Sequence, residues 1–386
     1  MPSPPRRLTQ RDIARLAGVS QPTVSLVLNN RAEGDVRISP ETRERVLRVI
    51  RETGYVADPV ARRLAARFNR IFGVFTYEPA FPSGSWDFFY PFLLGIEEAA
   101  ERIGCDLLLF TSAPVIDGRR RIFHQDNRLR LADGCILLGR EIDAGELRRL
   151  NEEGYRYVAI GRRDDAGGPV PYVGADYTSA VGELVRLALA RGHRRLGYLG
   201  QPGDVESTRD RRRGFVDHAG DAEYARVFEP TDVAPRRRAG RAASGQRRSR
   251  VPRQPADGPA STRAETAGSA MARAAAVLDA ALAERITVLF VEDTPTAVAL
   301  HELARERGLS VPGGLSIVTL GEPTTPVSSP TQFTSFRIPR EEMGRRAVEI
   351  LAARIDSPPE PVPQILLPCE LVEGSTLGAP EVPARD

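Results

Sequence analysis

The chain has 386 residues, of which 41% are hydrophobic, so it can form two or three packed domains. No run of 18 apolar residues occurs and the first residues carry no apolar leader, so we expect neither a membrane span nor a signal peptide. The three cysteines lie far apart, which argues against a disulfide framework and a zinc cluster. These features predict a cytoplasmic protein without a metal or a cofactor.

The net charge of +3 is unevenly distributed along the chain. Residues 1–70 contain 14 Arg and 7 acidic residues, a balance of +7, and residues 235–263 contain 9 Arg and 1 Asp, a balance of +8. The remainder therefore carries −12. A basic N-terminal part beside an acidic bulk is typical of proteins that bind nucleic acid.

The N-terminal part predicts three short helices. The first runs from Thr9 to Ala17, with Thr9 as N-cap and Asp12 in capping-box register, and Gly18 lets the backbone leave it. Its predicted apolar stripe is Ile13, Leu16 and Ala17. Ser20 caps a second helix, Gln21 to Asn29, and Ser39 with Pro40 begins a third that ends at Gly54. Two short helices joined by a tight Gly-containing turn predict a helix-turn-helix.

The second helix is the predicted DNA reader, lying in the major groove with its N-terminal residues toward the base edges. Gln21 can pair with adenine, whereas Val24, Val27 and Leu28 are expected to hold the helices together. The other residues that we expect at the DNA are Thr9, Ser20, Pro22, Thr23, Ser25, Leu26 and Asn29.

The segments DIARLAGVSQPTVSLVLNN, ISPETRERVLRVIRETGY and DPVARRLA resemble, in order and spacing, the headpiece of the lactose/galactose repressor family. The resemblance implies a headpiece over residues 1–57 and a hinge helix in 58–70, where Leu64 would enter the minor groove when two copies pair on DNA. Without the resemblance, Leu64 is interpreted as a core residue on a helix face. The family usually has a polar base reader at the position of Leu26, and the Pro22 side chain cannot form a hydrogen bond with a base either. The preferred operator is therefore expected to differ from the family's usual one.

From Ile71 onward, short apolar runs alternate with amphipathic stretches, which predicts a parallel, doubly wound α/β sheet. The same resemblance implies a two-lobed, periplasmic-binding-protein-like effector and dimerisation domain over 71–375, followed by a tail, 376–386. We expect the N-terminal lobe to comprise about 71–170 and a late return near 295–335.

Six residues are candidates for binding an effector. The resemblance implies this role for Arg211 and Asp293, and an Arg with a carboxylate suits a sugar or another polyol. Alternatively, Asp293 caps the following helix and Arg211 lies on a solvated helix face. Arg162 is a weaker candidate because Gly161 stands where the family often has Asp. Tyr77 and Trp86, together with Phe81, could stack on a ligand ring or pack in the core.

Residues 229–270 lose all apolar periodicity and are rich in Arg, Pro, Ala, Gly and Ser. One hypothesis is a shift of the reading frame, which would remove a central strand from the C-terminal lobe. The other is a disordered basic arm that adds non-specific DNA affinity. Resequencing the gene separates the two hypotheses.

These patterns predict a sequence-specific DNA-binding regulator: a repressor that binds a near-palindromic operator as a homodimer and responds to a small, sugar-like effector. An enzyme is disfavoured, because the four histidines occur in no nucleophile or metal motif. The alternative that follows from a frame shift is a degenerate regulator with a working headpiece and a defective effector domain.

Overall fold

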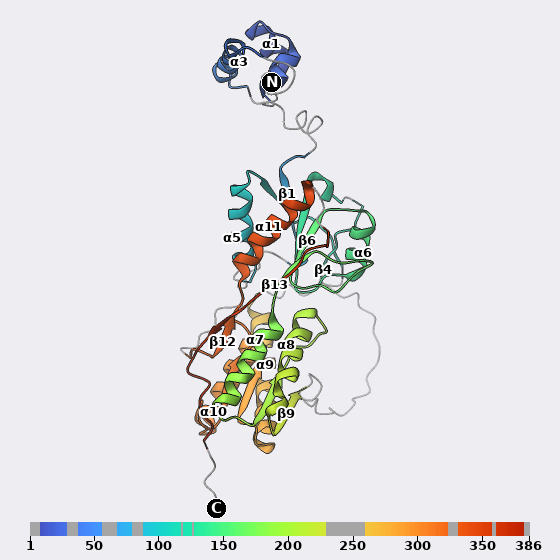
Figure 1. Cartoon of the computed structure of the whole chain (residues 1–386). Helices are drawn as coiled ribbons and strands as arrows, with labels where there is room; N and C mark the ends of the chain where they lie inside the picture. The colour runs from blue at the N-terminus through green and yellow to red at the C-terminus, as the bar shows by residue number, and fades with distance from the viewer. Residues whose placement is uncertain are drawn as a thin grey trace, which may run out of the picture. The chain divides into compact units, whose positions relative to one another are not determined.

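The computed structural model divides into two compact units, Met1–Asn69 and Arg70–Asp386, and Figure 1 shows the course of the chain in each. The first unit is a helical headpiece and the second is an α/β body. The structure describes residues 8–28, 38–55, 68–78, 88–116, 119–125, 127–228, 259–322, 331–356 and 360–381.

The headpiece consists of α1 (Gln10–Ala17), α2 (Gln21–Leu28) and α3 (Pro40–Thr53). The predicted capping box is present: the Thr9 side chain accepts from the backbone N–H of Asp12, and the Asp12 carboxylate accepts from the backbone N–H of Thr9. Gly18 ends α1 at φ 64° and Gly54 ends α3 at φ 60°, a left-handed conformation that glycine adopts without strain. The predicted helix-turn-helix is confirmed.

The three helices enclose one small core. Its buried residues are Ile13, Ala14, Ala17, Val24, Val27 and Val46. The prediction for Leu16 was wrong, because Ala14 lies on the packed face with Ile13 and Ala17 while Leu16 is 54% exposed. The face of α1 that contacts α2 and α3 is therefore narrower than its apolar residues suggest.

The N-terminal lobe of the body contains a six-stranded parallel sheet of order β13-β7-β6-β5-β1-β2. One face packs against α6 through a core that includes Phe75, Cys135 and Leu147, and α5 and α11 lie on the other, side by side although far apart in sequence (Figure 1). The elements are β1 (Ile71–Thr76), α5 (Tyr90–Arg102), β2 (Asp106–Phe110), β5 (Gly134–Leu138), α6 (Ala144–Glu152), β6 (Tyr157–Ile160), β7 (Tyr172–Ala175), α11 (Arg340–Asp356) and β13 (Gln364–Leu367).

The C-terminal lobe contains a four-stranded parallel sheet of order β11-β10-β8-β9. Alternate residues of its strands face opposite layers: Leu289 and Val291 pack on α9 and α10, whereas Phe290 lies 5.5 Å from the ring of Phe215 on α8. The elements are α7 (Tyr177–Ala190), β8 (Arg195–Leu199), α8 (Glu206–His218), β9 (Tyr224–Phe228), α9 (Pro259–Ala283), β10 (Val288–Val291), α10 (Thr294–Glu306) and β11 (Ser316–Thr319). Two parallel sheets with helices on both faces confirm the predicted α/β class.

The chain crosses between the lobes three times. The segment that returns to the N-terminal lobe late in the sequence differs from the expected one. Residues 294–319 belong to the C-terminal lobe, because β11 pairs with β10. The return to the N-terminal lobe is made by α11 and β13, which supplies the sheet edge beside β7. Between the crossings, β12 (Ser335–Arg337) and β14 (Glu370–Val372) pair as an antiparallel ribbon.

The segment 229–270, which lacks apolar periodicity, ends earlier in the structure than its composition suggested. Residues 229–258 lie outside the described residues, but 259–270 form the first turns of α9. The central strand that a frame shift was expected to remove is not missing from the sheet, since β8 and β10 pair directly and β9 forms the edge beside β8. The strand β9, YARVF, was overlooked in the sequence because it is short and only partly buried.

The predicted tail, 376–386, begins with residues that pack on the C-terminal lobe. Thr376 and Leu377 are buried, and the backbone N–H of Ile317 donates to the carbonyl of Thr376 at 2.9 Å. His193 fixes this segment: its Nε2 lies 2.8 Å from the Gly378 carbonyl and its Nδ1 lies 2.9 Å from Thr287 Oγ1. A carbonyl only accepts, so Nε2 carries the proton and the neutral imidazole fits both contacts.

Stability should therefore fall at acidic pH through His193. Burial lowers the pKa of His193 from its ordinary value of 6.5, so the unfolded chain binds a proton that the folded chain excludes. The contribution is complete above pH 6.5 and is lost as the pH falls below it. We expect the urea midpoint of the body to decrease from pH 7.5 to pH 5, and to decrease less steeply in His193→Gln. An equal slope in the two proteins would contradict this assignment.

Candidate DNA interface and effector site

The outer face of α2 presents the predicted reading residues. Val24 and Val27 are buried against the other helices, which leaves Gln21 and Pro22 exposed at the start of α2. Ser20 has the capping role, since its Oγ accepts from the backbone N–H of Thr23 at 3.3 Å. The remaining predicted readers on α2, which are Thr23, Ser25 and Leu26, are partly buried.

Arg11 is a residue of this face that the sequence reasoning missed. Its Nε donates to Gln21 Oε1 at 3.4 Å, and both side chains are exposed. A guanidinium here can bind a phosphate and orient the Gln21 amide at the same time. The only signal in the sequence was an Arg on the helix preceding the turn.

Three other predicted DNA contacts are placed differently or not described. The Thr9 hydroxyl is committed to the cap, where it lies 2.7 Å from Asp12 Oδ2. Asn29 and Leu64 lie outside the described residues.

Within the body, the carboxyl ends of the two sheets meet at the junction between the lobes. Arg163, which follows β6, pairs with Glu206 in the first turn of α8 at 3.0 Å and also donates to the Gly139 carbonyl after β5. Its neighbour Arg162 pairs with Asp210 of α8 at 2.6 Å. Ligands of such sheets bind at these strand ends, so this junction is the candidate effector site.

Arg211 lies at this junction and is not on a solvated helix face. Its Nε and Nη1 donate to the carbonyls of Leu320 and Ser207 at 3.0 and 3.1 Å. Its guanidinium stacks on the ring of Tyr177, 3.7 Å from the centroid, at the first crossing between the lobes. Arg162 also lies here, but its guanidinium is engaged by Asp164 and Asp210.

Asp293 is the N-cap of α10, which is the alternative role considered for it. Its Oδ2 accepts from the backbone N–H of Thr296 at 3.3 Å and contacts Arg273 Nη1 at 4.0 Å. The preceding residue, Glu292, was missed: its carboxylate accepts from the Tyr198 hydroxyl and from the backbone N–H of Gln201. Burial raises the pKa of Glu292 and the nearby charge of Arg211 lowers it. A carboxylate at the end of an apolar strand was the available signal.

The aromatic candidates do not line this junction in the described residues. Tyr77 is 1% exposed and belongs to the core between the N-terminal sheet and α6, 5.0 Å from the ring of Phe75. We therefore no longer include Tyr77 in the site. Trp86 and Phe81 lie outside the described residues.

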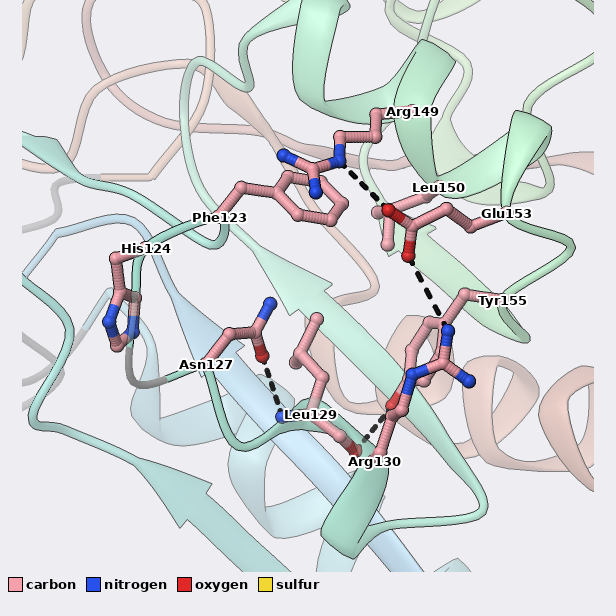
Figure 2. Close-up of a pocket in the computed structure, with 9 residues that line it drawn as sticks. All are labelled: Phe123, His124, Asn127, Leu129, Arg130, Arg149, Leu150, Glu153 and Tyr155. Atoms are coloured by element: carbon pink, nitrogen blue, oxygen red, sulfur yellow. Dashed lines mark hydrogen bonds and ion pairs between the residues drawn. The ribbon is translucent and has the colours of Figure 1, made fainter.

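A pocket of about 430 Å³ lies elsewhere on the N-terminal lobe, as Figure 2 shows. Leu129, which precedes β5, and Tyr155, which precedes β6, line it, so it lies at the amino ends of these strands. Its charged side chains satisfy one another, since Glu153 pairs with Arg149 at 2.8 Å and with Arg130 at 3.6 Å. It is thus separate from the junction where the strands' carboxyl ends meet.

The described residues contain no group of three or more His, Cys, Asp or Glu that could hold a metal ion. They also contain no helix with the length and apolarity that a membrane span requires.

Comparison with known proteins agrees with this architecture. The sequence profile described as "Bacterial regulatory proteins, lacI family" matches residues 9–58. Profiles for "Periplasmic binding proteins and sugar binding domain of LacI family" and "Periplasmic binding protein-like domain" match residues 81–234 and 185–377. The chain belongs to the lacI family of bacterial regulatory proteins. It is a DNA-binding transcriptional regulator with a periplasmic-binding-protein-like body, rather than an enzyme.

Two relatives of this lacI-family regulator match along almost the whole chain. The regulator CelR of Thermobifida fusca is 28% identical over 91% of this chain and 92% of its own length. The regulator Rv3575c of Mycobacterium tuberculosis is 29% identical over 98% of this chain and 99% of its own. A lac repressor dimer bound to operator and the anti-inducer ONPF shares the fold, with a TM-score of 0.67 at 19% identity over 97% of this chain and all of the other.

Proposed function

We propose that this regulator is a repressor that binds a near-palindromic operator as a homodimer and changes its operator affinity when a small polyhydroxylated effector binds between the lobes. The observation that carries the proposal is the joining of an exposed reading helix, α2, to a two-lobed body whose sheet ends meet at a junction rich in arginine and carboxylate. Because a bacterial regulator must reach DNA inside the cell, we place the protein in the bacterial cytoplasm.

The effector class is supported by relatives and by chemistry. One solved structure of similar fold, at 24% identity and a TM-score of 0.57, is a complex of CelR with cellobiose. A sucrose operon repressor of Klebsiella pneumoniae is 29% identical over 55% of this chain. Carboxylates that accept from hydroxyls, such as Glu292 and Asp293, and the guanidinium of Arg211 are groups that bind a polyol. We keep Arg211 and Asp293 in the proposed site and add Glu292.

Selection from a pool of random duplexes tests the DNA-binding part of the proposal. The full-length protein should enrich one inverted repeat whose half-sites are spaced by about one helical turn. Enrichment of a single half-site would contradict the dimeric arrangement. Absence of any enriched sequence, with binding that salt abolishes equally on all duplexes, would contradict sequence-specific binding altogether.

Gln21→Ala should weaken binding to the selected operator by about 1–3 kcal/mol and relax the preference at one base pair of each half-site. The reason is the loss of a bidentate amide from the exposed start of α2. Affinity for a scrambled duplex, measured by fluorescence anisotropy at the same salt, should not change. Equal loss on both duplexes would show that Gln21 contacts only the phosphate backbone.

The degenerate regulator is the second candidate, and one observation disfavours it. It was motivated by a missing central strand, whereas β8 and β10 pair directly and β9 is in place. If no compound of a broad sugar and sugar-acid panel changes operator affinity or thermal stability, the degenerate alternative gains support.

A further inference from the structure

Three guanidinium groups converge where the lobes meet, and we call Arg140, Arg211 and Arg340 the arginine cluster. Arg140 follows β5, Arg211 lies on α8, and Arg340 is the first residue of α11, at the second crossing. Arg140 and Arg340 lie over the same ring, Phe88, with Cζ atoms 4.7 and 5.6 Å from its centroid. The cluster therefore joins residues from both lobes and from a crossing.

Arg340 is buried without adequate partners. Its side chain is 8% exposed, and its Nε and Nη2 have no hydrogen-bond partner among the described residues. The nearest carboxylate, Glu322, lies 3.8 Å from Nη1 and is shared with Arg337, whose Nε is 3.1 Å away. A buried guanidinium with two orphaned donors is strongly unfavourable, so these donors point to a binding partner that the described residues do not supply.

The other two arginines do not relieve this excess of positive charge. Arg211 donates to main-chain carbonyls, and Arg140 stacks on Phe88; neither forms an ion pair with a described carboxylate. Burial lowers the pKa of Arg340, and the charges of Arg211 and Arg140 lower it further, against the opposing influence of Tyr177 and Glu322.

The carboxylates around the cluster form no ion pair with Arg140 or Arg211, and Glu78 Oε2 is itself buried without a hydrogen-bond partner among the described residues. Glu78 accepts from the backbone N–H of Arg140 at 3.1 Å, and Asp210 pairs with Arg162. Glu292 accepts from Tyr198 and Gln201, and burial raises the pKa of both Glu78 and Glu292. The junction thus holds both cationic donors and carboxylate acceptors.

We propose that the effector of this regulator carries an oxyanion, either carboxylate or phosphate, which binds Arg340 together with Arg140 and Arg211 while its hydroxyls bind Glu292 and Asp293. This inference rests on the proposed effector site between the lobes and narrows its ligand class to sugar acids or phosphorylated sugars. A neutral sugar would leave the orphaned donors of Arg340 without an anion.

Matched ligands test this directly on the full-length protein. Glucose, gluconate and glucose 6-phosphate, the same three forms of galactose, and inorganic phosphate should be compared by thermal shift, with chloride added to equal ionic strength. We expect the anionic forms to raise the melting temperature and the neutral sugars to have no effect, and the order of gluconate and glucose 6-phosphate will distinguish carboxylate from phosphate. No stabilisation by any oxyanion beyond chloride overturns the inference.

Arg340→Met provides a test that needs no ligand. Removing a buried charge whose Nε and Nη2 lack partners should raise the melting temperature of the ligand-free protein, by about 2–4 °C, and should weaken the response to the stabilising anion at least tenfold. Arg346→Gln, on the same helix with a half-exposed side chain paired to Glu342 and Glu349, is the control and should change neither quantity. A lower melting temperature in Arg340→Met, with the anion response intact, overturns the inference.

If Arg340→Met does not fold, Arg140→Gln replaces it and should lose the anion response. The inference and the proposed function fail in different ways. Modulation of operator binding by a neutral sugar alone overturns the anionic class but leaves a ligand-controlled repressor. Failure to enrich any operator in the duplex selection contradicts the regulator's proposed mode of action without affecting anion binding by the body.

Discussion

Ile13→Ala should abolish operator binding by unfolding the headpiece. Ile13 is fully buried in a core of six buried residues, and truncation of a core isoleucine to alanine destabilises by about 2–5 kcal/mol. A domain of this size has little stability to spare, so this loss is comparable to its whole free energy of unfolding. We expect operator affinity to fall at least 100-fold and the headpiece amides to lose hydrogen-exchange protection, while the melting of the body is unchanged.

Leu16→Ala is the matched control on the same helix. Leu16 is 54% exposed, so its truncation removes little packing and should leave the headpiece amides protected. If Leu16→Ala and Ile13→Ala lost protection equally, the packed face of α1 would be different from the one described.

Gly344→Ala should destabilise the N-terminal lobe, because α5 and α11 pack through their main chains. A Cβ on Gly344 would lie 2.3 Å from the carbonyl oxygen of Phe92, and one on Gly95 would lie 1.9 Å from that of Glu341. Backbone atoms on both sides cannot move independently of their helices, so the overpacking should cost about 3 kcal/mol or more, at the upper end of such substitutions. Gly95→Ala should have a similar effect.

The measurement is urea unfolding of the full-length protein, followed by tyrosine and tryptophan fluorescence. Gly220→Ala is the control, because a Cβ at Gly220 meets nothing within 4 Å. Equal midpoints for Gly344→Ala and Gly220→Ala would mean that the two helices are not in main-chain contact. An unchanged affinity of Gly344→Ala for a scrambled duplex would show that the effect is confined to the body.

Much of the fold could be predicted from local patterns. The capping box at Thr9, the glycine stop at Gly18 and the apolar runs of β1, β5, β6, β8, β10 and β11 are local signals, and each formed the expected element. The order of the strands in each sheet was harder to predict, because β9 and β13 are short edge strands with partly exposed residues. The packing of α11 on α5 in the N-terminal lobe depends on Gly95 and Gly344. Glycine has no side chain, so these two positions give no hydrophobic signal in the sequence.

The candidate effector site was predicted only in part. Arg211, on α8, and Asp293, two residues after β10, were proposed from the family resemblance, whereas Glu292, the residue directly after β10, was overlooked. Arg340 could not be found, because it opens a charged helix far along the sequence and only the crossing brings it to the junction. Tyr77 was assigned to the site, but its side chain is buried in the core between the N-terminal sheet and α6.

The interleaved order of the lobes also bears on how the protein is made. The sheet of the C-terminal lobe uses residues between Arg195 and Thr319 and is complete when that stretch has left the ribosome. The N-terminal lobe begins much earlier, yet it must wait for α11 and β13, which end at Leu367. The first half to be translated is therefore the last to close, and its apolar surface, which α11 later covers, stays exposed to chaperones and proteases for most of synthesis.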